Sequence, residues 1–82
     1  MNKYETNTES TPIAVNASYY PSRPPLLRYI ELFGQVHQVN NSQFAHAIRR
    51  GREKVYIFSV LVGANNYRLR FETDTLKWYL ES

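Results

Sequence analysis

The chain has 82 residues, enough for one domain, and it contains no cysteine. The absence of cysteine excludes disulfides, thiol catalysis and cysteine-ligated zinc, and it favours an intracellular compartment. Ten Lys and Arg against seven Asp and Glu give a net charge of +3, a mild bias towards acidic partners.

Residues 1–21 are polar and rich in Asn, Thr and Ser, and we expect a flexible tail followed by a single domain over 22–82. The alternative is that Pro12–Val15 and Ser18–Tyr20 add a strand to a sheet edge or tuck two tyrosines under the fold. The tail has no signal-peptide pattern, and no apolar run approaches about 18 residues. We therefore expect a cytoplasmic protein with no membrane partner.

Residues 24–33 predict a short helix. The prolines at its start suit a first helical turn, and Leu26, Ile30 and Phe33 fall on one helical face. Gly34 fits the position just after a helix end. A strand is the alternative, because the aromatic and β-branched residues of this segment also suit a sheet.

Residues 41–50 predict a second short helix. Asn41 or the serine after it can cap the N-terminus, and Phe44 and Ile48 are four residues apart on one face. Gly51 fits the position after the helix end.

The last third of the chain predicts a three-stranded antiparallel meander over about 54–62, 67–73 and 76–81. Its strands are rich in aromatic and β-branched residues, with turn residues at Gly63–Asn66 and Asp74–Thr75 between them. Together with the two helices this gives an α+β fold, in which the helices cover one face of the sheet.

A two-residue loop at Asp74–Thr75 fixes a register for the second hairpin. Phe71 then opposes Trp78, and the leucines at 69 and 80 oppose each other, on one apolar face. The other face carries two opposite-charge pairs and one cation–aromatic pair: Glu72 with Lys77, Arg68 with Glu81, and Arg70 with Tyr79.

Four cations within six residues, at positions 49–54, form a basic corner that leads into the meander. Such a cluster can contact phosphates, and a tyrosine near it can stack on a base. The alternative is helix capping with charge that keeps the surface solvated. The candidate nucleic-acid-binding residues are Arg49, Arg50, Arg52, Lys54, Arg70 and Tyr79.

The first strand of the meander is apolar on both faces. Val55, Ile57 and Leu61 point away from the predicted core, and apolar edge strands are normally covered. The cover could be the chain's own N-terminal half, a second copy of the chain or a different protein. These three residues are the candidate protein interface.

The sequence lacks the residues of a catalytic site. His37, His46 and the single aspartate, Asp74, form no local catalytic or metal-binding pattern, and three glycines build no phosphate loop. We expect no enzyme activity, cofactor, metal or small-molecule substrate.

The expected function is that of a small regulator that binds nucleic acid, DNA more than RNA, through the basic corner. The alternative is a protein-interaction or inhibitory module, alone or as a homodimer, that uses the apolar first strand. The short length and polar tail would suit a phage or mobile-element protein.

Overall fold

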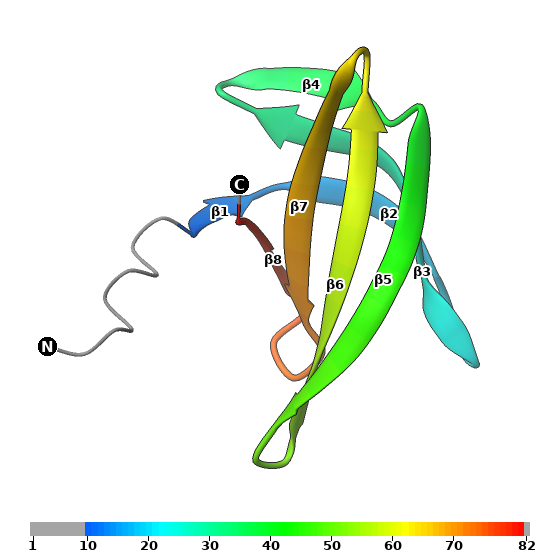
Figure 1. Ribbon diagram of the computed structural model, residues 1–82, viewed down its shortest axis with the longest axis vertical. Coiled ribbons are helices and arrows are strands. Elements are labelled where there is room, and N and C mark those ends of the chain that lie inside the picture. Colours follow the sequence, from blue (N-terminus) through cyan, green and yellow to red (C-terminus); the bar gives the residue numbers. More distant parts are fainter. Residues whose placement is uncertain (1–9, 82) are drawn as a thin grey trace, which may run out of the picture.

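The computed structural model describes residues 10–81, and every regular element in this range is a β-strand (Figure 1). The strands are β1 (Thr11–Ile13), β2 (Val15–Tyr20), β3 (Arg23–Leu32), β4 (Gln35–Gln38), β5 (Asn41–Arg50), β6 (Glu53–Val62), β7 (Asn65–Glu72) and β8 (Lys77–Leu80). The predicted α+β class is therefore wrong, and the described part of the chain is all-β.

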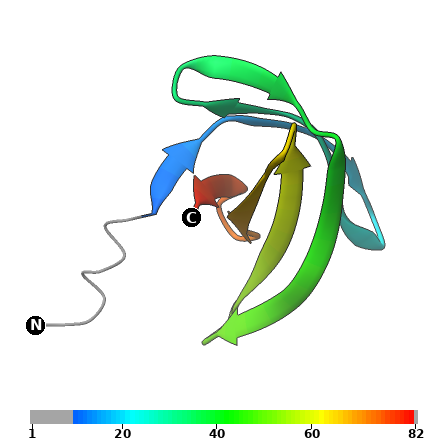
Figure 2. The same ribbon diagram turned by 45° about the horizontal axis from the view of Figure 1, so that its top comes forward.

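The strands form two antiparallel sheets that face each other (Figure 2). One sheet has five strands in the order β1-β8-β7-β6-β5, and the other has three in the order β2-β3-β4. The core lies between them and consists of apolar side chains from both sheets: Leu27, Ile30, Leu32, Phe58, Val60, Leu69, Phe71 and Trp78.

The chain passes from one sheet to the other at two corners. Ala14 separates β1 from β2, and its carbonyl oxygen accepts a hydrogen bond from the Glu31 amide at 3.0 Å. Val39 and Asn40 separate β4 from β5, and the Asn40 amide donates to the Leu61 carbonyl oxygen at 2.9 Å. The backbone thus remains hydrogen-bonded where the two sheets meet.

The short length of β4 opens the sandwich on one side. β4 has four residues and pairs only with Tyr29–Leu32, whereas β3 and β5 have ten residues each. Beyond the end of β4, no strand of the described chain lies hydrogen-bonded between β3 and β5. The result is a wedge-shaped gap with its narrow end at the β4–β5 corner.

The helix predicted over 24–33 is strand β3. Its buried residues Leu27 and Ile30 are three apart, because a bulge against β2 at Arg28 interrupts the two-residue period. That three-residue step imitates the spacing of a helical face. Phe33, expected on the apolar side of the helix, lies in the β3–β4 turn and is 85% exposed.

The helix predicted over 41–50 is strand β5. A bulge between Phe44 and His46 places Phe44 and Ile48 on opposite faces of the sheet. Their four-residue spacing, which predicted a shared helical face, therefore does not bring them together. β5 pairs along the whole length of β6. This pairing satisfies backbone groups on both strands and overrides the local helix preference.

The glycines expected after the two helices adopt left-handed backbone angles, but in hairpin turns. Gly34 has φ of 81° beside Phe33 with φ of 53°, the pair of positive values that a type I′ turn requires. Gly51, with φ of 60°, opens the two-residue turn between β5 and β6. Glycine thus marks the chain reversal correctly, without specifying the element that precedes it.

The predicted meander is confirmed as β6, β7 and β8. Phe71 opposes Trp78 and Glu72 opposes Lys77, as the loop length implied. The first hairpin turns earlier than expected, since Val62 pairs with Asn65. The register differs by an even number of residues, so the residues assigned to the inner face remain there.

Residues 11–20 form β1 and β2 in place of the expected flexible tail; residues 1–9 lie outside the described range. The alternative of a strand added to a sheet edge is confirmed, because β1 pairs with β8, Ile13 opposite Trp78.

Candidate nucleic-acid interface

A cleft of about 580 Å³ opens at the wide end of the wedge, between the β2–β3 and β5–β6 hairpins. Five aromatic residues of its lining come from four strands, two of them from the end of β2 and one each from β5, β6 and β7. The aromatic lining is Tyr19, Tyr20, Phe44, Tyr56 and Phe71. Pro24 and Pro25 form part of the opposite wall.

The aromatic rings of the cleft pack against one another and the core. The Phe44 ring meets Tyr56 edge-on at 5.3 Å between centroids, and Tyr56 lies 6.3 Å from Phe71. Tyr19 lies 6.0 Å from Phe71, and its hydroxyl accepts a hydrogen bond from Trp78 Nε1 at 3.2 Å. Such contacts hold the rings in fixed orientations.

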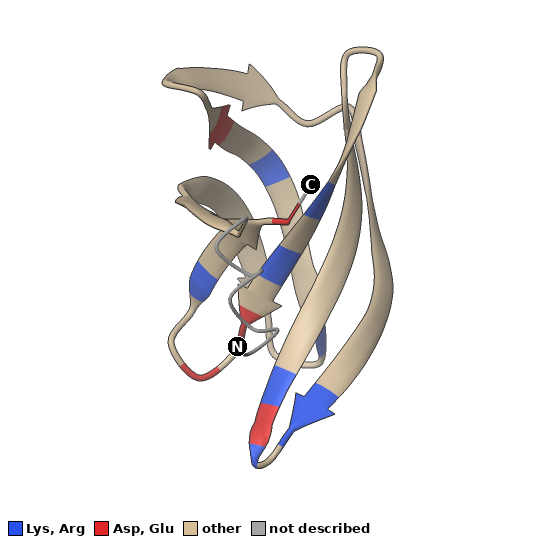
Figure 3. Cartoon of the chain, turned by 60° about the vertical axis from the view of Figure 1, so that its left-hand side comes forward, with Lys and Arg blue, Asp and Glu red and all other residues tan. Residues whose placement is uncertain are grey.

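Two cations belong to the lining of this aromatic cleft, and Lys and Arg positions gather at the adjoining β5–β6 hairpin (Figure 3). The Arg23 guanidinium lies 4.1 Å above the Tyr20 ring, and Lys54 forms part of the lining. Arg49 is the cross-strand partner of Lys54 and shares its face, and Arg52 lies in the adjoining turn. No Asp or Glu is among the residues that line the cleft.

Arg50 belongs to the predicted basic corner but faces the other way. Its guanidinium lies 3.3 Å from Glu53 and 3.3 Å from Glu72, on the outer face of the five-stranded sheet. The structure therefore brings Arg49, Arg52 and Lys54 together and separates Arg50 from them.

Arg70 and Tyr79 also lie on the outer face, on the opposite side of the five-stranded sheet from the cleft lining. Arg70 Nη1 pairs with Glu81 at 2.7 Å, and its Nε lies 3.3 Å from Glu72 without hydrogen-bond geometry. The guanidinium lies 4.4 Å above the Tyr79 ring, and the Arg70 side chain is only 15% exposed. This cluster holds the sheet surface together and presents little positive charge to solvent.

The candidate protein interface on β6 is mostly buried by the chain itself. Val55 and Ile57 are 2% and 4% exposed, and Leu61 is half-buried. Ile48 and Glu72 flank Val55 on the neighbouring strands β5 and β7. β5 covers the edge of β6 that was expected to be open, which corresponds to the alternative of cover by the same chain.

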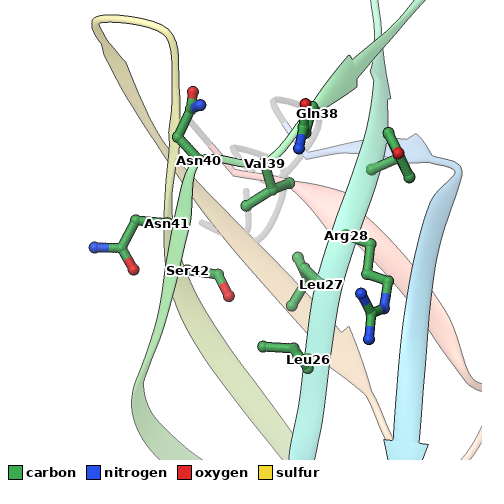
Figure 4. Close-up of a pocket in the computed structure, with 9 residues that line it drawn as sticks. Leu26, Leu27, Arg28, Gln38, Val39, Asn40, Asn41 and Ser42 are labelled. Carbon is green, nitrogen blue, oxygen red and sulfur yellow. The ribbon is translucent and has the colours of Figure 1, made fainter.

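The narrow end of the wedge is a smaller hollow of about 270 Å³ (Figure 4). Ser42 of β5 and Leu26 of β3 point toward one another across it, and Val39 closes it at the corner. On its β3 side, Arg28 Nε donates to Ser18 Oγ at 2.9 Å. The β4–β5 wall of the hollow is thus largely polar, and the β3 wall combines two leucines with Arg28 and Tyr29.

Several residues of the cleft could not be grouped from the sequence. Tyr19 and Tyr20 lay in the predicted tail, Arg23 before a predicted helix, and Phe44 on a helix face. A signal was present, since two adjacent tyrosines followed by Pro, Ser and Arg put aromatic rings and a cation at one turn. Without the strand pairing, nothing connected that turn to Lys54.

The histidines and acidic residues singled out in the sequence do not gather at one place in the described range. No group of three His, Cys, Asp or Glu lies close enough to bind a metal in residues 10–81. Ser42 lines the wedge, whereas His46 opposes Ile57 on the outer face, so the two do not meet. The same range contains no helix long and apolar enough to cross a membrane.

No protein family, curated protein or solved structure matches this chain. The interpretation of the cleft therefore depends on its own chemistry.

Proposed function

We propose that this protein binds single-stranded nucleic acid in the cleft between the β2–β3 and β5–β6 hairpins. Unpaired bases would stack on the aromatic lining, and Arg23, Arg49, Arg52 and Lys54 would contact the phosphates. The observation that carries the proposal is an aromatic cleft whose charged lining residues are all cations.

The distribution of charge supports this proposal. Glu53, Glu72 and Glu81 lie on the outer face, where Arg50 and Arg70 neutralise them. The cations at the cleft mouth form no ion pair with another described residue. The outer face combines these three carboxylates with four cations, whereas no Asp or Glu lines the cleft. A polyanion would therefore meet the more attractive potential at the cleft.

The aromatic lining favours single strands over duplexes. Stacking on a side chain needs the π-face of a base, which is covered by its neighbours in a duplex. Stacking tolerates every base, so the cleft alone would give little sequence preference. We propose a non-enzymatic, cytoplasmic regulator, with single-stranded DNA as the first ligand to examine.

Removing cations from the cleft mouth tests the proposal. Arg49→Ala with Lys54→Ala should weaken binding to an oligonucleotide in fluorescence anisotropy. It should also reduce the slope of log K against log salt by about 1.4, at about 0.7 per lost phosphate contact on a single strand. The matched control is Arg68→Ala with Lys77→Ala, which removes the same charge from exposed positions on the outer face.

The control should bind with nearly the wild-type salt slope. Equal slopes for the wild type and the Arg49/Lys54 variant would contradict the proposed site, and an equal loss in both variants would show non-specific attraction by net charge.

A second candidate function is strand pairing with a partner protein through β5. This ten-residue strand is hydrogen-bonded only to β6 in the described chain, and Phe44 and Ile48 are 43% and 41% exposed. It ranks second because a bulge and two terminal arginines are features that hinder edge pairing. A dimer mass in sedimentation equilibrium at micromolar concentration, lost on adding a proline within β5, would favour it.

A further inference from the structure

Two described residues other than glycine adopt left-handed backbone angles, and both carry large apolar side chains. Phe33 has φ of 53° and is 85% exposed, and Leu76 has φ of 60° and is 64% exposed. For bulky residues this backbone region is strained, and such strain is found mostly at functional sites. Leu76 lines the cleft described above, which leaves the position of Phe33 to be explained.

Phe33 lines a second cleft, at the opposite end of the sandwich. This cleft, of about 570 Å³, lies between the β3–β4 and β6–β7 turns. Phe33 and Tyr67 provide aromatic surface, and the remaining polar lining consists of amides and one imidazole: Gln35, His37, Gln38, Asn40 and Asn65. No Lys, Arg, Asp or Glu is among its lining residues.

The second cleft meets the narrow end of the wedge at the β4–β5 corner. Gln38 and Asn40 line both the second cleft and the narrow end of the wedge. The Asn40 side-chain oxygen accepts a hydrogen bond from the Gly63 amide at 2.7 Å, so this corner is fastened to the β6–β7 turn. A chain that leaves the wedge at its narrow end therefore reaches the second cleft across a fixed corner.

We propose that the second cleft holds an unpaired base of the same nucleic-acid strand whose phosphates lie at the cleft between the β2–β3 and β5–β6 hairpins, called the basic cleft below. This inference rests on the proposed function and adds base discrimination to it. The exposed Phe33 ring offers a stacking face. Side-chain amides present a donor and an acceptor side by side, the arrangement that reads the edge of a base.

The chemistry of the lining favours a base over a phosphate at this end. A phosphate needs cations or several backbone amides, and the lining has no Lys or Arg. Neutral amides and aromatic rings suit the flat, uncharged, hydrogen-bonding surface of a base. The basic cleft would thus supply most of the affinity for the strand, and the second, amide-lined cleft would supply the preference among bases.

Phe33→Asn separates this role from a structural one. Asn tolerates positive φ, and Asn followed by Gly is the preferred pair for a type I′ turn. The substitution should therefore raise the melting temperature by about 2–6 °C. It should also weaken binding of a 12-nucleotide strand about fivefold or more, and Phe33→Trp should retain binding. Val36→Asn, at an exposed position of the same hairpin, is the control.

Strand length and base identity complete the test. Anisotropy with 4- and 12-nucleotide homopolymers should show the Phe33→Asn loss only with the longer strand, together with smaller differences among bases. Wild-type binding to the 12-mer by Phe33→Asn would overturn the inference and leave the proposed function intact. A joint loss of stability and binding would overturn it too, because Phe33 would then be a support of the turn. If the wild type bound no strand, the proposed function and this inference would both fail.

Discussion

Arg70 and Lys54 are both strand cations, but their surroundings differ. Arg70 contacts Glu72, Glu81 and the Tyr79 ring, and its cross-strand neighbour Ile57 is buried. The Lys54 side chain is exposed at the cleft mouth and forms no ion pair with another described residue. We therefore propose that the first cation stabilises the sheet and that the second contributes to the proposed binding of a polyanion.

We therefore expect opposite effects from two alanine substitutions. Arg70→Ala should lower the free energy of unfolding by about 1–3 kcal/mol, because it leaves Glu81 without its cation and removes cover from Ile57. Lys54→Ala should change it by less than about 0.5 kcal/mol. Urea unfolding, followed by the fluorescence of the single tryptophan, measures both. Equal stability of the two variants would show that the Arg70 cluster contributes no more than an exposed charge.

The hydrogen bond from Trp78 to Tyr19 gives a second prediction at this scale. Trp78 is 5% exposed, and Tyr19→Phe leaves its indole N–H without this acceptor. The loss of unfolding free energy should be about 0.5–1.5 kcal/mol. Tyr29→Phe is the control, since the Tyr29 hydroxyl bonds to no described residue and its side chain is 45% exposed. A loss of the same size in both variants would argue against this bond.

At the scale of the elements, β1 and β2 are the clearest departure from a tail. Ile13 is partly buried against the core and opposes Trp78. Ile13→Ala should lower the free energy of unfolding by about 1–2 kcal/mol, less than the range for a fully buried residue. Val36→Ala, at a 70% exposed position, should have little effect. An unchanged midpoint for Ile13→Ala would mean that β1 adds nothing to stability.

The elements that could be predicted are those joined by short turns. The meander and the Phe71–Trp78 register follow from turn residues and the two-residue period. The segments at 24–33 and 41–50 could not be assigned in this way. The bulge at Arg28 spaces the buried residues of β3 as a helix does, and the bulge after Phe44 puts Phe44 and Ile48, four residues apart, on opposite faces of the sheet. Only long-range pairing with β2 and β6 decides between the two structures.

The candidate site was predicted to the same extent as the strands that form it. The basic residues Arg49, Arg52 and Lys54 lie on one hairpin and could be grouped from the sequence alone. Arg50 could not be separated from them, because its direction depends on the β5–β6 register and on Glu72 of β7. The aromatic half could not be predicted, because the tyrosines near the β2–β3 turn gave only a local signal and their place beside Lys54 depends on how the two sheets pack.

At the scale of the whole molecule, one short strand produces the cleft. β4 ends after four residues, and β3 and β5 continue past it without an intervening strand in the described chain. Tyr19 and Phe44, which line the cleft, are 55% and 43% exposed. The basic cleft and the amide-lined cleft then lie at opposite ends of the sandwich, with the outer face of the five-stranded sheet left for structural ion pairs.

The most direct test of this account is an amide chemical-shift titration of the ¹⁵N-labelled protein with a single strand of about 12 nucleotides. We predict that shifts change at the β2–β3 and β5–β6 hairpins and along the cleft-facing residues of β5 and β6, including Ala47 and Tyr56. The amides of Arg70, Lys77 and Tyr79 should be unaffected. Changes confined to that outer face, with none at the two hairpins, would contradict the account.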